Sequence, residues 1–380
     1  MNQAVLVISG YNIRAIVAFC RWATAHDIKF HIIAKSKEDP IFLTDYKDCV
    51  CLIRDSPKLL HEQFRTWVDS LCLKYGYQRI IILPSTEYLN RFLLENRNLI
   101  ESDNCIIPLV DERLYKNISD KYSFAQLCNA YGLDIPAEFN HIPEQLPFVA
   151  KPRSNYSAEG KQLILHLIHN SQDLENFCSN YEINEYFLQQ FVSGRSFYLF
   201  AYIGKGGLNN NILFSQENLM QQAQGGSIIL AKHSKFHHDE IAKHYVTMLR
   251  DQNFFGLIMI EVRLDESNGH YYMIEANPRL WGPLQFCIDN NVDLFGAMLG
   301  DYGFEISQKL SSCNPTTHYF WSGGLTQQSQ PIAYHSYTSD DFVKDFKWLR
   351  TQDIFLRKDT LSLFLKESEV KDTHEYFPFN

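Results

Sequence analysis

Carboxylate and amide side chains recur at strand spacing in two neighbouring segments of the chain. Glu261 follows one apolar run, and Glu275 and Asn277 lie two residues apart after a second. Alternate residues of a β-strand share one face, so Glu275 and Asn277 should point to the same side. If a hairpin folds about Asn268, Glu261 and Glu275 are equidistant from the turn and stand opposite each other, with side chains about 5 Å apart. Three oxygen ligands would then converge.

A bound metal ion would explain why these groups converge. Two carboxylates without a counter-charge repel each other, whereas Mg²⁺ binds a few hard oxygens and completes its shell with phosphates and water. We therefore predict a nucleotide-dependent Mg²⁺ site with Glu261, Glu275 and Asn277 as ligands, and Mn²⁺ is an alternative ion. The competing interpretation is a solvated hairpin face whose charges have no function. A register slip of one residue would separate the ligands.

The elements that must position these groups begin with an α/β pattern. Short apolar runs occupy 5–8, 30–34, 50–53 and 80–83, and apolar residues at helical spacing cover 13–23 and 59–75. Apolar runs that alternate with helical patterns predict β-α-β units. We expect a small parallel-sheet α/β domain over residues 1–118.

A second unit begins near Ser119. The polar residues Ser119 and Asp120 are predicted to cap a helix that Gly132 ends. Strands are predicted over 148–152, 163–167 and 186–192, and a helix over 173–180, before Ser193-Gly194 breaks the pattern. From residue 197 to about 300 the strands are longer, and two of them flank the turn 265–269, which predicts a β-hairpin. We expect this part to be α+β with a mixed sheet.

The E-x-N-P-R sequence from Glu275 to Arg279, with the acid Glu261 on the preceding strand, resembles the metal-binding core of the ATP-grasp superfamily. Lys121 resembles the first nucleotide-binding lysine of that superfamily, and Lys151 resembles the second, which contacts phosphate. The E-x-N-P-R element is moderately specific and each lysine alone is a weak signal, but they occur in the family order. The resemblance spans about residues 5–300.

The resemblance implies how the rest of the chain is organised. After the N-terminal domain it implies a lid subdomain over 119–193 and a core subdomain over 194–305, which carries the nucleotide and metal site. Residues 306–380 would form a C-terminal segment that packs on the core.

Segment 188–194 resembles the hinge between lid and core, where family members hold adenine through main-chain groups. This resemblance implies adenine contacts from Gln189, Gln190 and Val192, with the Gln189 carbonyl and the Val192 N–H facing the base. A buried strand followed by a turn is the competing interpretation of the segment.

Two positions depart from the family pattern. The loop after the second lysine is glycine-rich in many relatives, whereas here Ser157 and Gly160 are the candidates for phosphate contacts. Relatives commonly place an acid two residues after the hinge glycine to bind ribose. This chain has Arg195 and Ser196 after that glycine, which makes Ser196 the candidate for a weaker ribose contact.

The family chemistry implied is transfer of the ATP γ-phosphoryl group to a substrate carboxylate, followed by amine attack on the acyl phosphate and release of ADP and phosphate. Lys151 and Arg279 would be the catalytic residues, because phosphoryl transfer depends on charge neutralisation and alignment. Arg279 in a structural ion pair with Glu261 or Glu275 is the competing interpretation. A non-catalytic ATP-binding regulatory module and an enzyme with a non-amine acceptor also stay open. A biotin-dependent carboxylase fits less well, since we find neither a biotinyl-lysine segment nor a long glycine loop.

Composition excludes several other classes. The net charge is −9, and the sequence has no basic stripe that could bind a phosphate backbone. We therefore expect small-molecule carboxylate and amine substrates and no nucleic acid. The first apolar run stops at Gly10 and no basic residues precede it, so we expect neither signal peptide nor membrane contact, and a cytoplasmic location. The bulky residues after Gly10 argue against a dinucleotide-dependent oxidoreductase. A homodimer is compatible with the sequence.

Overall fold

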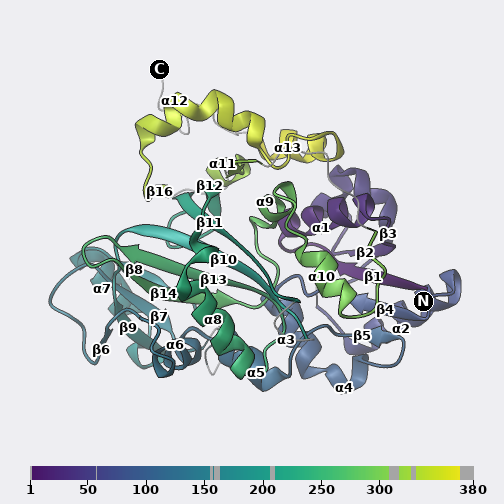
Figure 1. Ribbon diagram of the computed structural model, residues 1–380, viewed down its shortest axis with the longest axis horizontal. Coiled ribbons are helices and arrows are strands. Elements are labelled where there is room, and N and C mark those ends of the chain that lie inside the picture. Colours follow the sequence, from purple (N-terminus) through teal and green to yellow (C-terminus); the bar gives the residue numbers. More distant parts are fainter. Residues whose placement is uncertain are drawn as a thin grey trace.

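The computed structural model describes residues 2–56, 58–154, 157, 163–205, 210–307, 316–326 and 331–368. Its strands form three sheets of five, seven and four strands (Figure 1). The first sheet is parallel and the other two are antiparallel, which confirms the predicted α/β class with an α+β second part. The prediction of a mixed core sheet is wrong, because all pairings among the described strands of that sheet are antiparallel. None of the described helices is long and apolar enough to cross a bilayer.

The N-terminal sheet has the strand order β3-β2-β1-β4-β5, and all its pairings are parallel. Its strands are β1 (Gln3–Ile8), β2 (Phe30–Ala34), β3 (Val50–Ile53), β4 (Arg79–Ile82) and β5 (Cys105–Ile106). Its helices are α1 (Ile13–Ala25), α2 (His61–Tyr75), α3 (Glu87–Glu95), α4 (Arg97–Ile100) and α5 (Glu112–Ser119). Every residue of the central strand β1 is buried, as expected for a sheet covered on both faces. The predicted β-α-β units are confirmed.

The four-stranded sheet has the order β6-β9-β7-β8. Its strands are β6 (Glu138–Phe139), β7 (Phe148–Pro152), β8 (His166–Ile168) and β9 (Tyr186–Gln190), and its helices are α6 (Lys121–Ala130) and α7 (Ser171–Asn180). Two strand predictions need correction: residues 163–165 are not in a strand, and β9 ends at Gln190, two residues early. An aromatic and aliphatic cluster around Phe148 and Phe177 packs this sheet on α7.

The cap of α6 also differs from the prediction. Asp120 occupies the N-cap position but its carboxylate makes no capping hydrogen bond. The Arg91 guanidinium instead donates to Asp120 Oδ1 at 2.8 Å and to Ser119 Oγ at 2.9 Å. A charged partner outcompetes a backbone N–H for these oxygens. Gly132, with φ +69°, follows the end of the helix as predicted.

The core sheet has the order β14-β13-β10-β11-β12-β15, and β16 pairs with β11. Its strands are β10 (Arg195–Ile203), β11 (Ile212–Gln221), β12 (Ile228–His233), β13 (Gly256–Asp265), β14 (His270–Asn277), β15 (His318–Phe320) and β16 (Ala333–Tyr334). Beside it lie α8 (Glu240–Asp251), α9 (Leu284–Asp289) and α10 (Leu294–Gly300). Alternate residues of β10 belong to two hydrophobic clusters: Phe197 and Leu199 join that of α8, and Tyr198 and Phe200 join that of α1 and α9. Both faces of this strand are therefore buried.

The β13–β14 hairpin reaches the predicted pairing by an unpredicted route. Residues 262–265 pair with 270–273, a register that would place Ile274 opposite Glu261. A one-residue β-bulge at Ile274 shifts the pairing, so that Glu261 instead faces Glu275. The facing of the two acids is confirmed, although the turn is centred between Ser267 and Asn268 and not on Asn268.

The C-terminal segment contributes β15, β16, α11 (Gly323–Thr326), α12 (Ser339–Leu349) and α13 (Leu361–Ser368). Short 3-10 helices complete the described chain: η1 (Pro40–Leu43), η2 (Asp45–Cys49), η3 (Ile183–Glu185), η5 (Phe236–His238), η6 (Arg350–Gln352) and η7 (Lys358–Thr360). Figure 1 shows this segment running from the core sheet back to the N-terminal domain.

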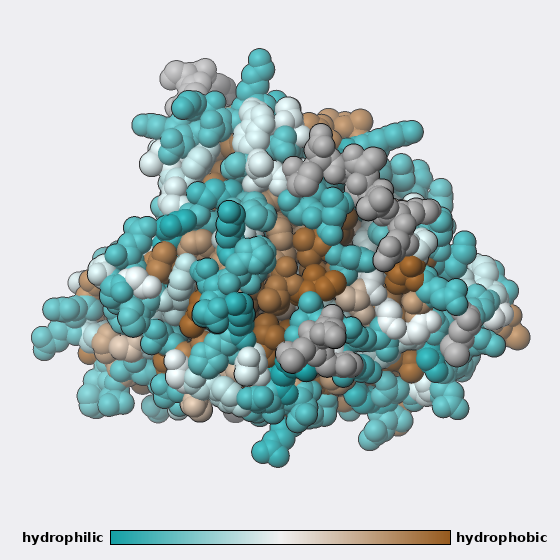
Figure 2. All heavy atoms as spheres, viewed as in Figure 1, coloured by the Kyte–Doolittle hydropathy of each residue, from teal (hydrophilic) through white to brown (hydrophobic). Residues whose placement is uncertain are grey.

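Figure 2 shows a largely hydrophilic surface with apolar side chains gathered near the middle of the visible face. The proposed boundaries at 118, 193 and 305 stay predictions.

Arg21 of α1 fastens the C-terminal segment to the N-terminal domain. Its guanidinium pairs with Asp359, with Nε 2.7 Å from Oδ2, and donates to Thr360 Oγ1 at 2.7 Å and to the Ile354 carbonyl at 2.8 Å. Burial opposes ionisation of Asp359, but Arg21 and the Tyr46 hydroxyl outweigh it and lower the pKa of this carboxyl. This partly buried ion pair connects helix α1 near the N-terminus with the C-terminal segment.

Arg21→Ala is expected to destabilise the protein by about 3 kcal/mol, because it leaves the Asp359 carboxylate partly buried without its cation. The folded pKa of Asp359 is lowered, so the contribution of the pair is present above about pH 4 and is lost as the pH falls through the folded pKa. Urea unfolding at pH 7 should show a lower midpoint, and the difference from wild type should shrink in acid. The exposed-site variant Arg113→Ala is the control, and equal midpoints for the two variants would contradict the prediction.

Candidate nucleotide and metal site

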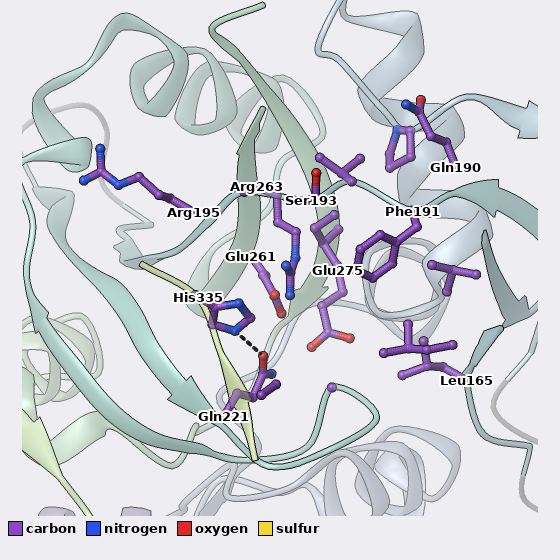
Figure 3. Close-up of a pocket in the computed structure, with 18 of the residues that line it drawn as sticks. Leu165, Gln190, Phe191, Ser193, Arg195, Gln221, Glu261, Arg263, Glu275 and His335 are labelled. Atoms are coloured by element: carbon purple, nitrogen blue, oxygen red, sulfur yellow. Dashed lines mark hydrogen bonds between the residues drawn. The ribbon is translucent and has the colours of Figure 1, made fainter. Parts of the chain in front are cut away.

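A cavity of ≈ 420 Å³ lies between the four-stranded sheet and the core sheet. Its apolar wall is formed by Val149, Leu165, Leu167, Phe191 and Val192. The opposite wall carries the charged groups of β13 and β14 (Figure 3). A pocket with one apolar side and one charged side can accept a flat aromatic base and its phosphates.

Glu261 and Glu275 point into this cavity from neighbouring strands (Figure 3). Glu261 is 5% exposed, and burial together with the nearby Glu275 charge raises the pKa of Glu261 to about 7. Burial also opposes ionisation of Glu275, but the ion pair with Lys121 outweighs it and lowers the pKa of Glu275 to about 2. The cavity thus holds one carboxylate that is ion-paired with a lysine and a second, buried carboxylate that forms no ion pair with the described residues.

Lys151 is buried at the end of β7 and reaches across to the hairpin. Its Nζ donates to the Ile274 carbonyl at 2.9 Å, at the residue that forms the β-bulge. Burial, reinforced by the neighbouring Lys121 charge, lowers the pKa of Lys151 to about 7. The bulge therefore does two things: it brings Glu261 opposite Glu275, and its carbonyl binds Lys151.

Asn277 and Arg279 continue the charged wall beyond Glu275. Asn277 Nδ2 donates to Glu275 Oε1 at 2.7 Å, and Arg279 Nη2 donates to Asn277 Oδ1 at 3.0 Å. Arg279 forms no ion pair with any residue in the described part of the chain, which argues against the structural ion pair considered above. Its charge is available to a ligand.

The residues present fit a hard divalent cation. Two facing carboxylates, one with a pKa raised by burial and by the charge of the other, form a donor set that a cation would neutralise. Asn277 adds a third ligand if its amide turns by about 180°, so that Oδ1 replaces Nδ2 beside Glu275 and the hydrogen bond from Arg279 to Oδ1 is given up. Among the described residues no group of three or more His, Cys, Asp or Glu side chains could hold a metal ion alone, so a metal here would depend on Asn277, phosphate and water.

The predicted hinge contacts divide into two groups. Gln190, Phe191 and Val192 line the cavity. Gln189 does not: it is 1% exposed, pairs with strands on both sides, and its Nε2 donates to the Pro136 carbonyl at 3.4 Å. The adenine contacts, including the one from the Gln189 main-chain carbonyl, stay predictions.

The candidate ribose contact lies elsewhere. Ser196 is fully buried and does not line the cavity; its Oγ donates to Glu261 at 3.3 Å and accepts from Asn218 Nδ2 at 2.8 Å. Ser196 thus positions the Glu261 carboxylate and is not free for a sugar. Arg195 binds Glu217 in a fork, with bonds of 2.9 and 2.7 Å.

The predicted phosphate loop is only partly described. Ser157 lies in an irregular segment and does not line either cavity, and Gly160 is outside the described residues. Their phosphate contacts stay predictions.

Sequence reasoning missed several residues that line the cavity. Arg263 follows Glu261 by two residues on β13 and faces the same cavity (Figure 3). Because alternate residues of a strand share one face, the sequence could have predicted this position. His335 and Ser336 follow β16, and His335 Nε2 lies 3.1 Å from Gln221 Oε1. Burial lowers the pKa of His335 to about 3, so this imidazole is neutral at pH 7. No sequence signal marked this polar tail as part of a pocket.

A second cavity of ≈ 1150 Å³ lies behind the charged wall, between the core sheet and the N-terminal domain. It shares Lys121, Leu165, Gln224, Gly225 and Glu275 with the smaller cavity. Asn277 and Arg279 line the larger cavity only, as do Ser227 and Trp281. A group bound in one cavity can therefore meet a group bound in the other at Lys121 and Glu275.

Solved structures with similar folds place this arrangement among known proteins. One is the biotin carboxylase domain of the 2-oxoglutarate carboxylase of Hydrogenobacter thermophilus, solved with MgADP, ADP and bicarbonate; it is 13% identical, with a TM-score of 0.56 over 81% of this chain and 71% of that one. Another is the N5-carboxyaminoimidazole ribonucleotide synthetase of Thermotoga maritima, 14% identical, with a TM-score of 0.50 over 81% and 77%. A third is the L-amino acid ligase of Bacillus licheniformis, 15% identical, with a TM-score of 0.50 over 73% and 67%.

These similarities define the fold: the chain has the fold of these three proteins, the ATP-grasp fold. No protein-family model matches the sequence, and no curated protein matches it. At 13–15% identity the likeness extends to architecture and not to substrate.

Proposed function

We propose that the protein is an ATP-dependent ligase that activates a substrate carboxylate as an acyl phosphate for attack by an amine. The observation that carries the proposal is the shared wall: Lys121 and Glu275 border both a nucleotide-sized cavity and a larger second cavity. Phosphoryl transfer needs a donor and an acceptor that meet at a site of concentrated charge. The ATP-grasp fold supports the same reaction class.

Each cavity has a distinct role in the proposal. The base of ATP would lie against Phe191 and Val192, and its phosphates would meet Lys121 and Lys151. Mg²⁺, or Mn²⁺, would be held by Glu261, Glu275 and Asn277 and would supply charge neutralisation for the transferred phosphoryl group. The carboxylate substrate would occupy the larger cavity.

Arg279 is proposed to bind the acyl phosphate. It borders the larger cavity next to Asn277, and it forms no ion pair with the described acids. Its planar fork can hold two oxygens of a phosphoryl group or of the tetrahedral intermediate. Small-molecule substrates and a cytoplasmic location belong to the same proposal, and a homodimer is compatible with it.

Hydroxylamine trapping tests the proposal. A panel of amino acids and small acids is first screened for ATP-dependent phosphate release, and the best acid is then incubated with ATP, Mg²⁺ and hydroxylamine without amine. A hydroxamate should form, and Arg279→Lys should lower its yield about tenfold because an ammonium cannot reproduce the bidentate geometry. ATP affinity should be unchanged in this variant.

The same assay separates the alternatives. ATP binding without ADP formation on any acid would favour a regulatory module. ADP formation with hydroxamate, but without a product from any amine, would favour a different acceptor. If the acid drives ADP formation, hydroxamate never forms and Arg279→Lys matches wild type, the acyl-phosphate mechanism is wrong.

A further inference from the structure

An arginine from the opposite end of the sequence also borders the larger cavity. Arg14 lies in the first turn of α1, in the N-terminal domain. Its Nη1 donates to the Ile228 carbonyl at 3.3 Å and to the Tyr319 hydroxyl at 3.1 Å, and its Nη2 donates to Ser227 Oγ at 2.7 Å. All three acceptors are neutral. The side chain is thus held in place without losing its charge.

The donor count leaves part of this guanidinium free for a ligand. A guanidinium has five N–H groups, and the three bonds above use both hydrogens of Nη1 and one of Nη2. One N–H on Nε and one on Nη2 remain. Among the residues that the structure describes, no carboxylate pairs with Arg14. A partly buried cation without an anion is costly unless a ligand supplies one.

Packing fixes the plane of the guanidinium. Its Cζ lies 3.8 Å from the centroid of the Trp321 ring. A Cβ atom on Gly282 would lie 2.6 Å from Arg14 Cζ and 2.7 Å from both Nη1 and Nη2. Because these three distances are nearly equal, Gly282 lies over the flat face of the guanidinium. Only glycine allows this approach. Gly282 follows closely after Arg279, so the segment that carries Arg279 also packs against the guanidinium of Arg14.

We propose that Arg14 binds an anionic group of a substrate, a carboxylate or a phosphate, in addition to the carboxylate activated beside Arg279. The inference rests on the proposed function for the identity of the cavity as the substrate site. A fixed planar cation with two free N–H groups matches two oxygens of one anion. Substrates would then carry a second negative charge: an acceptor amino acid in place of a simple amine, or an acid with two anionic groups.

Calorimetry with two probe anions tests the proposal on the full-length protein saturated with MgADP. Succinate and inorganic phosphate are titrated into wild type, Arg14→Gln and Gly282→Ala. At least one anion should bind wild type, with a dissociation constant at least about tenfold lower than in either variant. Binding of succinate alone would identify a carboxylate site, and binding of phosphate alone a phosphate site.

Matched controls separate local from general effects. Arg113→Gln removes an exposed arginine, and Gly300→Ala adds a methyl group where no atom lies within 4 Å, so both should bind as wild type does. MgADP affinity should be equal in all five proteins. If neither anion binds wild type, or if both variants keep wild-type affinity, the proposal is wrong. Absence of hydroxamate in the trapping assay would overturn the ligase reaction and leave this anion-binding result in place.

Discussion

Replacing Glu275 by alanine should lower Mg²⁺-dependent ADP formation by about a thousandfold, comparable to the loss of a central electrostatic group in other active sites. Glu275 faces Glu261, pairs with Lys121 and borders both cavities. Its removal takes away a proposed metal ligand and the ion-pair partner of Lys121. Steady-state ADP release at saturating Mg²⁺ measures the effect.

The variant should remain folded, because Glu275 and Asn277 lie on a partly exposed face of β14. Asn277→Ala should also lower ADP formation, since it removes the proposed third ligand. Glu240→Ala, on the exposed side of α8, is the matched control and should keep full activity. Normal turnover in either Glu275→Ala or Asn277→Ala would remove the metal assignment.

Lys151→Ala should weaken ATP binding by about 10- to 100-fold, the value of one charge-assisted hydrogen bond to phosphate. Lys151 is 4% exposed and its amine faces a cavity with an incomplete balance of charge. Because the expected contact is with phosphate, the affinity for ATP and ADP should fall while that for adenosine should not. Calorimetry on the three ligands measures the difference.

A structural role for Lys151 would give another result. If the amine serves only to bind the Ile274 carbonyl at the bulge, Lys151→Ala would lower thermal stability and leave the ratio of ATP to adenosine affinity unchanged. Lys243→Ala, an exposed lysine on α8, should change neither quantity.

The sequence correctly predicted those parts of the fold that follow from the periodicity of polar and apolar side chains. Period-two spacing fixes the common face of Glu275 and Asn277, and the alternation of apolar runs with helical patterns predicts the parallel sheet. The bulge at Ile274 was not predictable, because no residue type marks it. The predicted turn centre was wrong by half a residue, and the bulge shifts the register by one residue, so Glu261 and Glu275 face each other as predicted although the reason given was wrong.

The remaining errors arise from contacts between distant residues. Ser196 was expected at a ribose but its hydroxyl binds Glu261 and Asn218, which come from strands on either side of β10. Asp120 was expected to cap α6 but binds Arg91, 29 residues away. Tertiary partners override local preference in both cases. Nothing local in the tail indicated that His335 would line the nucleotide cavity.

The position of the C-terminal segment has a consequence for how the protein is made. His335 meets Gln221 across 114 residues, and Asp359 meets Arg21 across 338. Translation proceeds at about 5–20 residues per second and domains fold as they emerge, from the N-terminus onward. The four-stranded sheet and strands β10 to β14 of the core sheet precede residue 280, yet β15 and β16 follow it and the wall of the smaller cavity is completed only by residues 333–336. A ribosome-bound chain would therefore form most strands of both sheets before this wall is complete, so ATP, if bound as proposed, would stabilise the chain most after residues 333–336 have been added.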